Sequence, residues 1–153
     1  MTNRICTALL FVLLLALGSA ASAQVNYTTK LTSGPFLVAP TAASVDWVVL
    51  NNDPSPVNVR ITVYQLTPTG KETVGGFSVA LTLAPGATTH NANSVGSLFF
   101  AGNYYEVVVE STSDSVHPNV NQWSSNGADG YIPETLIPAG SFVSIRVPKP
   151  SRP

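Results

Sequence analysis

Val57-Asn-Val-Arg-Ile-Thr-Val-Tyr-Gln65 is the stretch that decides the fold class, because apolar residues take every second position in it. Successive side chains of a strand point to opposite faces, so this spacing predicts a strand with one buried and one polar face. The same alternation predicts further strands at 44–50, 77–83, 104–110 and 143–147. The residues expected in the core are Val45, Trp47, Val49, Val57, Val59, Ile61, Val63, Phe77, Val79, Leu81, Leu83, Tyr105, Val107, Val109, Val143, Ile145 and Val147.

Shorter apolar stretches add to this set. Weaker strand candidates lie near 27–31, 120–124 and 131–136. Neighbouring residues of a strand face opposite ways. One member of each aromatic pair, Phe99-Phe100 and Tyr104-Tyr105, is therefore expected in the core.

Turn-forming residues separate the predicted strands at short intervals. Proline, glycine, asparagine and aspartate cluster at 51–56, 68–70, 85–86 and 126–130, and these residue types favour reversal of the chain. No stretch beyond residue 23 carries apolar residues at helical spacing. The sequence therefore predicts an all-β protein, an antiparallel β-sandwich of seven or eight strands, with a small closed barrel as the alternative.

Residues 1–23 have the organisation of a signal peptide. Arg4 precedes an apolar run of about 13 residues, and small residues then lead to Ala21-Ser-Ala23, the pattern of a signal-peptidase site. The run is shorter than the roughly 20 residues of a membrane-spanning helix. We therefore expect export by the general secretory route to a periplasm or the exterior, without a membrane span after cleavage. Residues 24–147 would form one domain, and 148–153 a disordered proline-rich tail.

Composition argues against several functions. The chain has 153 residues, of which 44% are hydrophobic and 10% charged, and its formal net charge is -1. Nucleic-acid binding is not expected, because there is no surplus of Lys and Arg to neutralise phosphates. The single cysteine, Cys6, lies in the predicted signal peptide. Its removal would exclude cysteine catalysis and thiolate metal sites from the exported protein.

The region 43–120 contains strand and turn motifs in a distinctive order. An asparagine-rich turn is followed by the Val-x-Val-x-Ile-x-Val strand, then by Leu83-Ala-Pro-Gly86 and by Gly102-Asn-Tyr-Tyr-Glu-Val107. This order resembles bacterial extracellular immunoglobulin-like domains of the cell-adhesion-related kind. The resemblance implies an immunoglobulin-like sandwich with an adhesive or accessory role, and it carries no catalytic residue. Asp114-Ser-Val-His-Pro-Asn-Val120 matches the usual acidic, Asn-rich end of those domains only in part.

Residues suited to catalysis or metal binding are few. His90 lies in a polar stretch that is expected to be an exposed loop, and Asp114 and His117 are three residues apart, which places them on opposite faces of an extended segment. Glu106 and Glu110 share the outward face of one strand, about 13 Å apart, and are expected to be solvated. We expect no catalytic residue, no metal site and no cofactor. A small hydrolase using His117 or His90 with Asp114 is an alternative.

The stretch 119–131 is a candidate glycan site. It places Trp123 and Tyr131 on either side of two turns that contain Asn126 and Asp129. An exposed aromatic ring can stack on a sugar ring while nearby polar groups bind its hydroxyls. The alternative is a hairpin in which Trp123 packs beneath the sandwich and the polar side chains satisfy the turn backbone.

These observations predict a secreted, non-enzymatic protein that acts as an adhesive, structural or accessory module. Its expected partner is an extracellular protein or a polysaccharide, and a carbohydrate-binding module using Trp123 and Tyr131 is the alternative. Self-association through sheet edges is a further expectation, because a chain with few charged residues has little to prevent its edge strands from pairing with those of another molecule. In that case the segment 24–38 would pair with the edge of a neighbouring molecule.

Overall fold

The structure is a computed structural model that describes residues 24–124 and 136–145. Several predictions concern residues outside these ranges and stay predictions: the signal peptide 1–23, the tail 148–153, most of the strand candidate 131–136, and the positions of Asn126, Asp129, Tyr131 and Val147. In the described part of the chain, no helix is long and apolar enough to cross a membrane.

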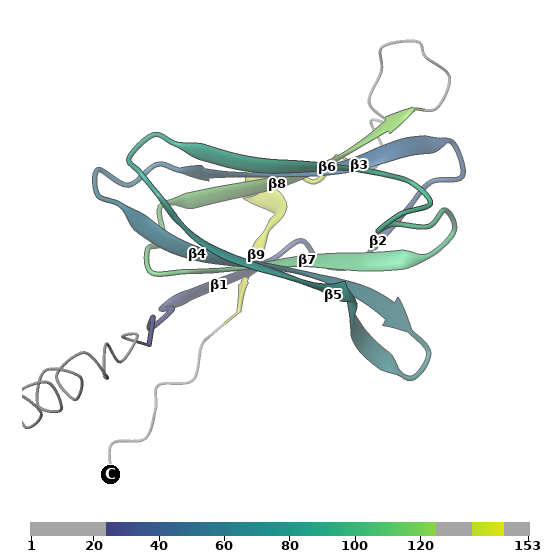
Figure 1. The fold of residues 1–153 in the computed structure, drawn as a ribbon, viewed down its shortest axis with the longest axis horizontal. Coiled ribbons are helices and arrows are strands. Elements are labelled where there is room, and N and C mark those ends of the chain that lie inside the picture. Colours follow the sequence, from purple (N-terminus) through teal and green to yellow (C-terminus); the bar gives the residue numbers. More distant parts are fainter. Residues whose placement is uncertain (1–23, 125–135, 146–153) are drawn as a thin grey trace, which may run out of the picture.

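Two antiparallel sheets pack face to face (Figure 1). The larger has the strand order β5-β4-β7-β1-β9, and the short β2 also pairs with β7. Its strands are β1 (Thr29–Thr32), β2 (Phe36–Leu37), β4 (Val57–Thr67), β5 (Gly70–Leu83), β7 (Tyr104–Ser111) and β9 (Val143–Ile145). The smaller sheet has the order β6-β3-β8 and consists of β3 (Ala42–Asn51), β6 (Thr88–Ser94) and β8 (Val116–Ser124). A 3-10 turn, Ala139–Ser141, precedes β9. The predicted all-β sandwich is confirmed.

The core lies between the sheets and has the predicted alternation. On β3, β4 and β7 the expected core residues are at most 3% exposed: Val45, Trp47, Val49, Val57, Val59, Ile61, Val63, Tyr105, Val107 and Val109. Phe99 and Tyr105 are buried while Phe100 and Tyr104 are exposed, so the prediction for the aromatic pairs is confirmed. Burial of one face of each sheet against the other is what holds the sandwich together.

The stretch around His90 is a strand and not the exposed loop that was predicted. Residues Thr88–Ser94 form β6, which pairs with β3 over its whole length. Thr89, Asn91 and Asn93 lie opposite core residues of β3 and therefore point inward. The prediction failed because β6 lies at the margin of the sandwich, where half-buried polar side chains fit on the inner face and no apolar stripe is needed.

Three expected core assignments are also wrong. On β9, Val143 and Ile145 are exposed, because the register pairs Ser144 with Leu31, the residue of β1 that packs against the core. The outward side of β9 therefore carries its apolar residues. Val79 is exposed as well. It lies on β5, an edge strand that the small sheet covers incompletely.

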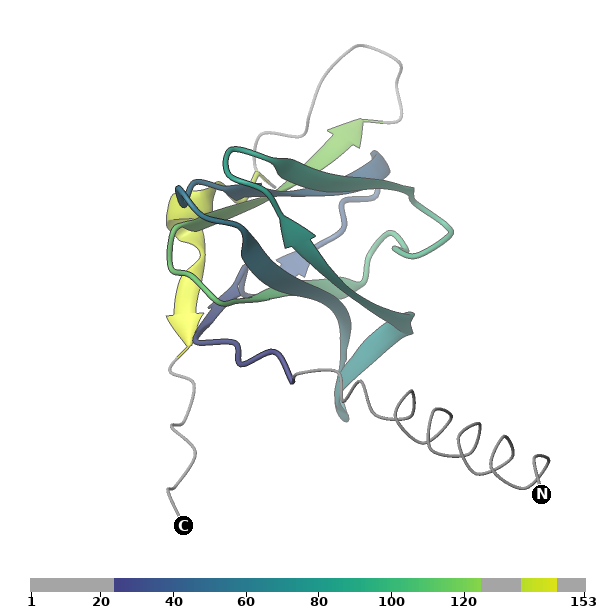
Figure 2. The same ribbon diagram turned by 60° about the vertical axis from the view of Figure 1, so that its left-hand side comes forward.

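The two lateral margins of the sandwich differ. At one margin, residues 136–145 cross from the small sheet, where Ile137 bridges Val120 of β8, to the large sheet, where β9 pairs with β1 (Figure 2). At the other margin lie the edge strands β5 and β6. Trp47 meets Phe77 of β5 there, edge to face, with 5.9 Å between ring centroids. Leu98, from the loop after β6, packs against the core near Gly75 of β5 at this margin.

The turn between β3 and β4 is held by the side chain of Asp53. Its Oδ1 accepts a hydrogen bond from the Ser55 amide at 2.9 Å, and its Oδ2 accepts one from the Ser113 hydroxyl at 2.6 Å. The Ser113 hydroxyl, followed by the Ser55 amide, holds the pKa of Asp53 below its ordinary value of 3.8, because both bonds favour the ionised carboxylate.

This geometry predicts an acid-dependent contribution to stability. A carboxyl group whose pKa is lowered by folding stabilises the protein above its ordinary pKa, and that contribution is lost as the pH falls through the folded-state pKa. Asp53→Asn is therefore expected to be less stable than the wild type at about pH 7, with a difference that shrinks below about pH 4. Urea unfolding at several pH values measures this. Asp114→Asn is the control, and an Asp53→Asn deficit that is constant with pH would contradict the prediction.

Candidate functional site

The outer face of the small sheet combines an exposed tryptophan with polar side chains. β3 pairs in register with both β6 and β8, and directly opposite residues share a face. The residues that point away from the core are Ser44, Asp46, Val48 and Leu50 from β3, Thr88, His90, Ala92 and Ser94 from β6, and His117, Asn119, Asn121 and Trp123 from β8. Together they form what we call the outer face.

Trp123 lies on the outer face and is 39% exposed. Its indole N–H donates a hydrogen bond to Asp46 Oδ2 at 2.5 Å, which orients the ring over β3. The inward position beside it belongs to the buried Gln122, whose side chain donates to the Leu37 carbonyl and accepts from the Ala39 amide. The alternative in which Trp123 packs beneath the sandwich is therefore wrong.

Polar groups lie near the indole. Asn121 donates from Nδ2 to Asn119 Oδ1 at 3.4 Å along β8. The second carboxylate oxygen of Asp46, Oδ1, is buried and has no hydrogen-bond partner. Sequence reasoning missed Asp46, because it lies 77 residues from Trp123 and only the register of β3 with β8 brings the two together.

Among the described residues, no hydrogen bond or ion pair joins either histidine to Asp114. His90 lies on β6 and His117 on β8, with β3 between them. Asp114 precedes β8, and its carboxylate accepts a long hydrogen bond, 3.5 Å, from the Ser115 hydroxyl. Within residues 24–124 and 136–145, no group of three or more His, Cys, Asp or Glu side chains is placed to hold a metal ion.

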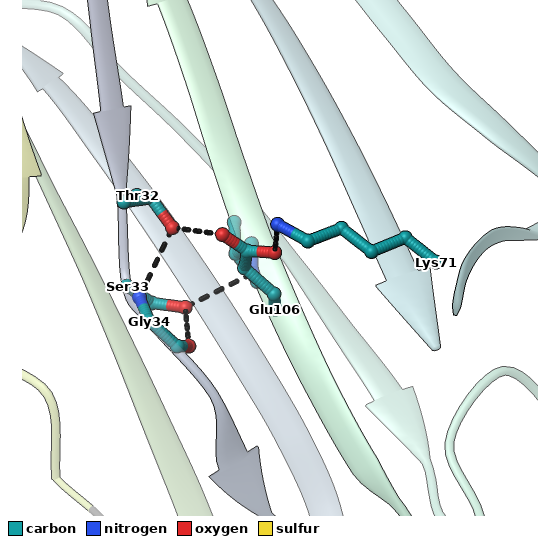
Figure 3. Close-up of polar contacts among 6 residues, drawn as sticks. Thr32, Ser33, Gly34, Lys71 and Glu106 are labelled. Atoms are coloured by element: carbon teal, nitrogen blue, oxygen red, sulfur yellow. Dashed lines mark hydrogen bonds and ion pairs between the residues drawn. The ribbon is translucent and has the colours of Figure 1, made fainter. Parts of the chain in front are cut away.

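Glu106 lies on the opposite side of the molecule, on the outward face of the large sheet. Figure 3 shows its carboxylate between Thr32 and Lys71. One carboxylate oxygen accepts a hydrogen bond from the Thr32 hydroxyl, and the other forms an ion pair with the Lys71 ammonium. Glu106 is only 4% exposed, so the prediction of a solvated residue is wrong. Lys71 reaches Glu106 from the β4–β5 hairpin. The alternation of apolar and polar residues along β7 could not reveal this contact. With both oxygens engaged, Glu106 links β1, β5 and β7.

Glu110, further along β7, also has a cationic partner. Arg60 Nε donates to Glu110 Oε2 at 2.5 Å, and the guanidinium carbon lies 4.8 Å from the centre of the Tyr27 ring. The guanidinium therefore bridges a carboxylate and an aromatic face. Both glutamates of β7 are thus parts of ion pairs: Glu110 pairs with Arg60 of the neighbouring strand β4, and Glu106 pairs with Lys71 of β5, on the far side of β4.

A cavity of about 380 Å³ lies at the margin that residues 136–145 cover. Its described lining consists of Ser33, Pro35, Phe36, Leu37, Leu136, Ile137 and Ser141. These residues include no acid, no base and no metal ligand. The Ser33 hydroxyl already donates to the Gly34 carbonyl and accepts from the Val107 amide. The described lining of the cavity therefore mixes apolar and polar groups and brings no acid, base or metal ligand together.

Comparison with known proteins provides no family for this chain. No protein-family model matches it, and no curated protein sequence is significantly similar. Among solved structures, Thermotoga maritima 1070 aligns with a TM-score of 0.46 and 12% identity, over 80% of this chain and 94% of that one. The Anabaena sensory rhodopsin transducer aligns with a TM-score of 0.40 and 18% identity, over 63% and 97%. Neither is an immunoglobulin-like adhesion domain, and similarity of this degree supports no conclusion about function.

Proposed function

We propose that this protein is an exported, non-enzymatic binding module that recognises a polysaccharide through the outer face of the small sheet. The observation that carries the proposal is the environment of Trp123, a large apolar ring that is exposed on a regular strand and oriented by Asp46. A ring held in this way offers a flat surface on which a sugar can stack. Little side-chain freedom is then lost on binding.

The groups near the ring suit a ligand rich in hydroxyls. Asn119 and Asn121 carry amides, which both donate and accept hydrogen bonds. The outer face carries no Lys or Arg, so an uncharged polymer fits it better than a polyanion.

The sequence supports a location outside the cell and a passive role. Residues 1–23 have the pattern of a signal peptide, and the region 43–120 resembles extracellular adhesive domains. Rigid strands position Trp123 and its polar neighbours without any need for a moving part. An accessory or adhesive module that attaches to a polysaccharide is consistent with each of these features.

Trp123→Ala is expected to weaken binding to an insoluble polysaccharide by about tenfold or more, because exposed tryptophans at binding surfaces commonly supply most of the binding energy. Depletion of the protein from solution by cellulose, chitin and peptidoglycan measures this. The control is Tyr104→Ala, which removes an aromatic ring that is 52% exposed but lies on the large sheet. The melting temperature of Trp123→Ala should stay within a few degrees of the wild type, since the ring is on the surface.

Fluorescence quenching provides a second readout. Trp47 is buried, so acrylamide should quench chiefly Trp123, and a bound polysaccharide should reduce that quenching. Failure of the wild type to bind any of the three polymers would contradict the proposal. So would equal binding by Trp123→Ala and Tyr104→Ala.

A further inference from the structure

The edge strand β6 has a free row of backbone hydrogen-bonding groups. The Asn51 amide donates to the Ala87 carbonyl at 2.9 Å, and the Val95 amide donates to the Ala43 carbonyl at 2.7 Å, so these two bonds bracket the ladder between β3 and β6. Hydrogen-bonded pairs recur at every second residue of an antiparallel ladder. The odd-numbered residues of β6 therefore direct their N–H and C=O groups to β3, and the even-numbered residues direct theirs outward.

The sequence of β6 does not protect this row. The strand Thr88-Thr-His-Asn-Ala-Asn-Ser94 contains no Lys, Arg, Asp, Glu, Pro or Gly, and its pairing with β3 has no register shift. Proteins usually guard exposed edges with charge, proline or a bulge. An uncharged, regular edge of seven residues is therefore a template on which another strand can pair.

The other outer strands in the described structure are protected. β8 is bridged at Val120 by Ile137, and β9 has only three residues. β5 carries Lys71 and Glu72, and its pairing with β4 is interrupted near Gly75 and Gly76, whose φ angles of 50° and 71° are left-handed. β6 is thus the edge best suited to pairing.

We propose that two copies of this protein pair through β6, antiparallel and edge to edge, about a two-fold axis at Asn91. In this register Asn91 lies opposite Asn91 of the second copy, and His90 lies opposite Ala92. Thr88 lies opposite Ser94. Every residue whose backbone groups point outward then falls in a hydrogen-bonded pair. The Ser94 carbonyl already accepts the Ser97 amide at 3.2 Å and the Ser97 hydroxyl at 2.7 Å, so the shared ladder gains about six backbone hydrogen bonds in place of the eight of a fully free row.

A second copy fits this edge better than an isolated peptide. Neither strand carries a charge, so antiparallel pairing brings no like charges together. β5 lies at the same margin, and its Val79 is exposed there. Two-fold pairing brings a second β5 margin toward Val79 and can cover it, whereas one added strand would lengthen the small sheet and leave Val79 in water.

Pairing of this kind joins the two small sheets into one of six strands and is independent of what the outer face binds. Because directly opposite residues share a face, the two copies of Trp123 would lie on the same side of the joined sheet. A dimer would therefore offer two copies of the outer face to one polymer chain.

Light scattering after size-exclusion chromatography tests the proposal. The wild type should double its mass as its concentration is raised from about 1 µM to about 200 µM. Ala92→Pro removes an N–H that faces the free edge and none that bonds to β3, so it should raise the dissociation constant at least tenfold without changing the melting temperature by more than a few degrees. Should Ala92→Pro fail to fold, the double variant His90→Lys with Ala92→Lys puts like charges opposite each other across the axis and should be monomeric.

Cross-linking tests the register. In a Cys6→Ser background, Asn91→Cys supplies the only thiol. Opposite residues of a non-hydrogen-bonded pair have Cα atoms about 4.5 Å apart, within the range of a disulfide. Mild oxidation should therefore cross-link Asn91→Cys dimers but not His90→Cys dimers, whose thiols lie out of register. A wild type that stays monomeric at the highest concentration overturns the proposal. So does a dimer that survives Ala92→Pro and the double lysine variant, or a cross-link at 90 in place of 91.

Discussion

Replacing Tyr105 with alanine is expected to lower the free energy of unfolding by about 3–5 kcal/mol. Tyr105 is fully buried on β7, its ring centroid lies 4.9 Å from that of Phe99 and 6.4 Å from that of Phe36, and its hydroxyl accepts the Phe100 amide at 2.9 Å. Alanine would leave a cavity between the sheets and a part-buried amide without its acceptor. Small domains are stable by about 5–15 kcal/mol, so this variant should be close to unfolding.

The neighbouring tyrosine provides a matched control. Tyr104 is exposed, and Tyr104→Ala is expected to cost less than about 0.5 kcal/mol. Tyr105→Phe keeps the ring and removes only the hydroxyl, at an expected cost of about 1 kcal/mol. Urea unfolding followed by circular dichroism gives all three values. Equal losses for Tyr104→Ala and Tyr105→Ala would show that the two rings are not divided between surface and core.

Asn51→Ala is expected to cost about 2–4 kcal/mol, a large effect for a polar residue. Asn51 is fully buried at the end of β3, and its Nδ2 lies 3.0 Å from each of the carbonyl oxygens of Ser55, Leu83 and Ala84. Its Oδ1 accepts the Asp53 amide at 2.9 Å. One side chain thus satisfies backbone groups from the β3–β4 turn and from the end of β5. Alanine leaves these groups without partners in a place that water enters poorly.

Two further variants separate this role from general sensitivity of the turn. Asn52 is exposed, and Asn52→Ala should cost less than about 0.5 kcal/mol. Asn51→Asp keeps the shape of the side chain but replaces its amide N–H donor with a carboxylate oxygen. That oxygen cannot donate to the three carbonyl oxygens and is repelled by them. Asn51→Asp should be at least as destabilising as alanine near pH 7, and less so near pH 4, where the new carboxyl can hold a proton. An Asn51→Ala cost equal to that of Asn52→Ala would contradict the assignment.

The central strands could be predicted from the sequence because their burial is decided locally. β3, β4 and β7 lie inside their sheets, so one face of each is covered along its length and apolar residues repeat at every second position. Edge strands depend on what lies across the sandwich. β6 carries polar residues on its inner face because the cover over it is incomplete, and β9 turns Val143 outward because its register places Ser144 opposite Leu31 of β1.

The candidate site could be predicted only in part, because its geometry depends on strands that are distant in the sequence. Trp123 was recognisable as an aromatic residue among polar ones, but the local sequence pattern did not show whether its side chain points into the core or to the surface. Val120 and Gln122 occupy the inward positions of β8, and a buried glutamine at such a position hides the alternation. Asp46 could not be found at all without the register between β3 and β8. The environment of Glu106 likewise depends on a lysine 35 residues away.

The position of β1 bears on how the molecule is made. β1 begins at Thr29 yet lies between β7 and β9, and β9 ends at Ile145. An emerging chain therefore lacks one neighbour of β1 until residues 104–111 have left the ribosome and the other until residues 143–145 have done so, and pairing over such sequence distances is slow. A nascent polypeptide with this strand order keeps its large sheet open while it is synthesised. It closes its large sheet only after its last strand has arrived.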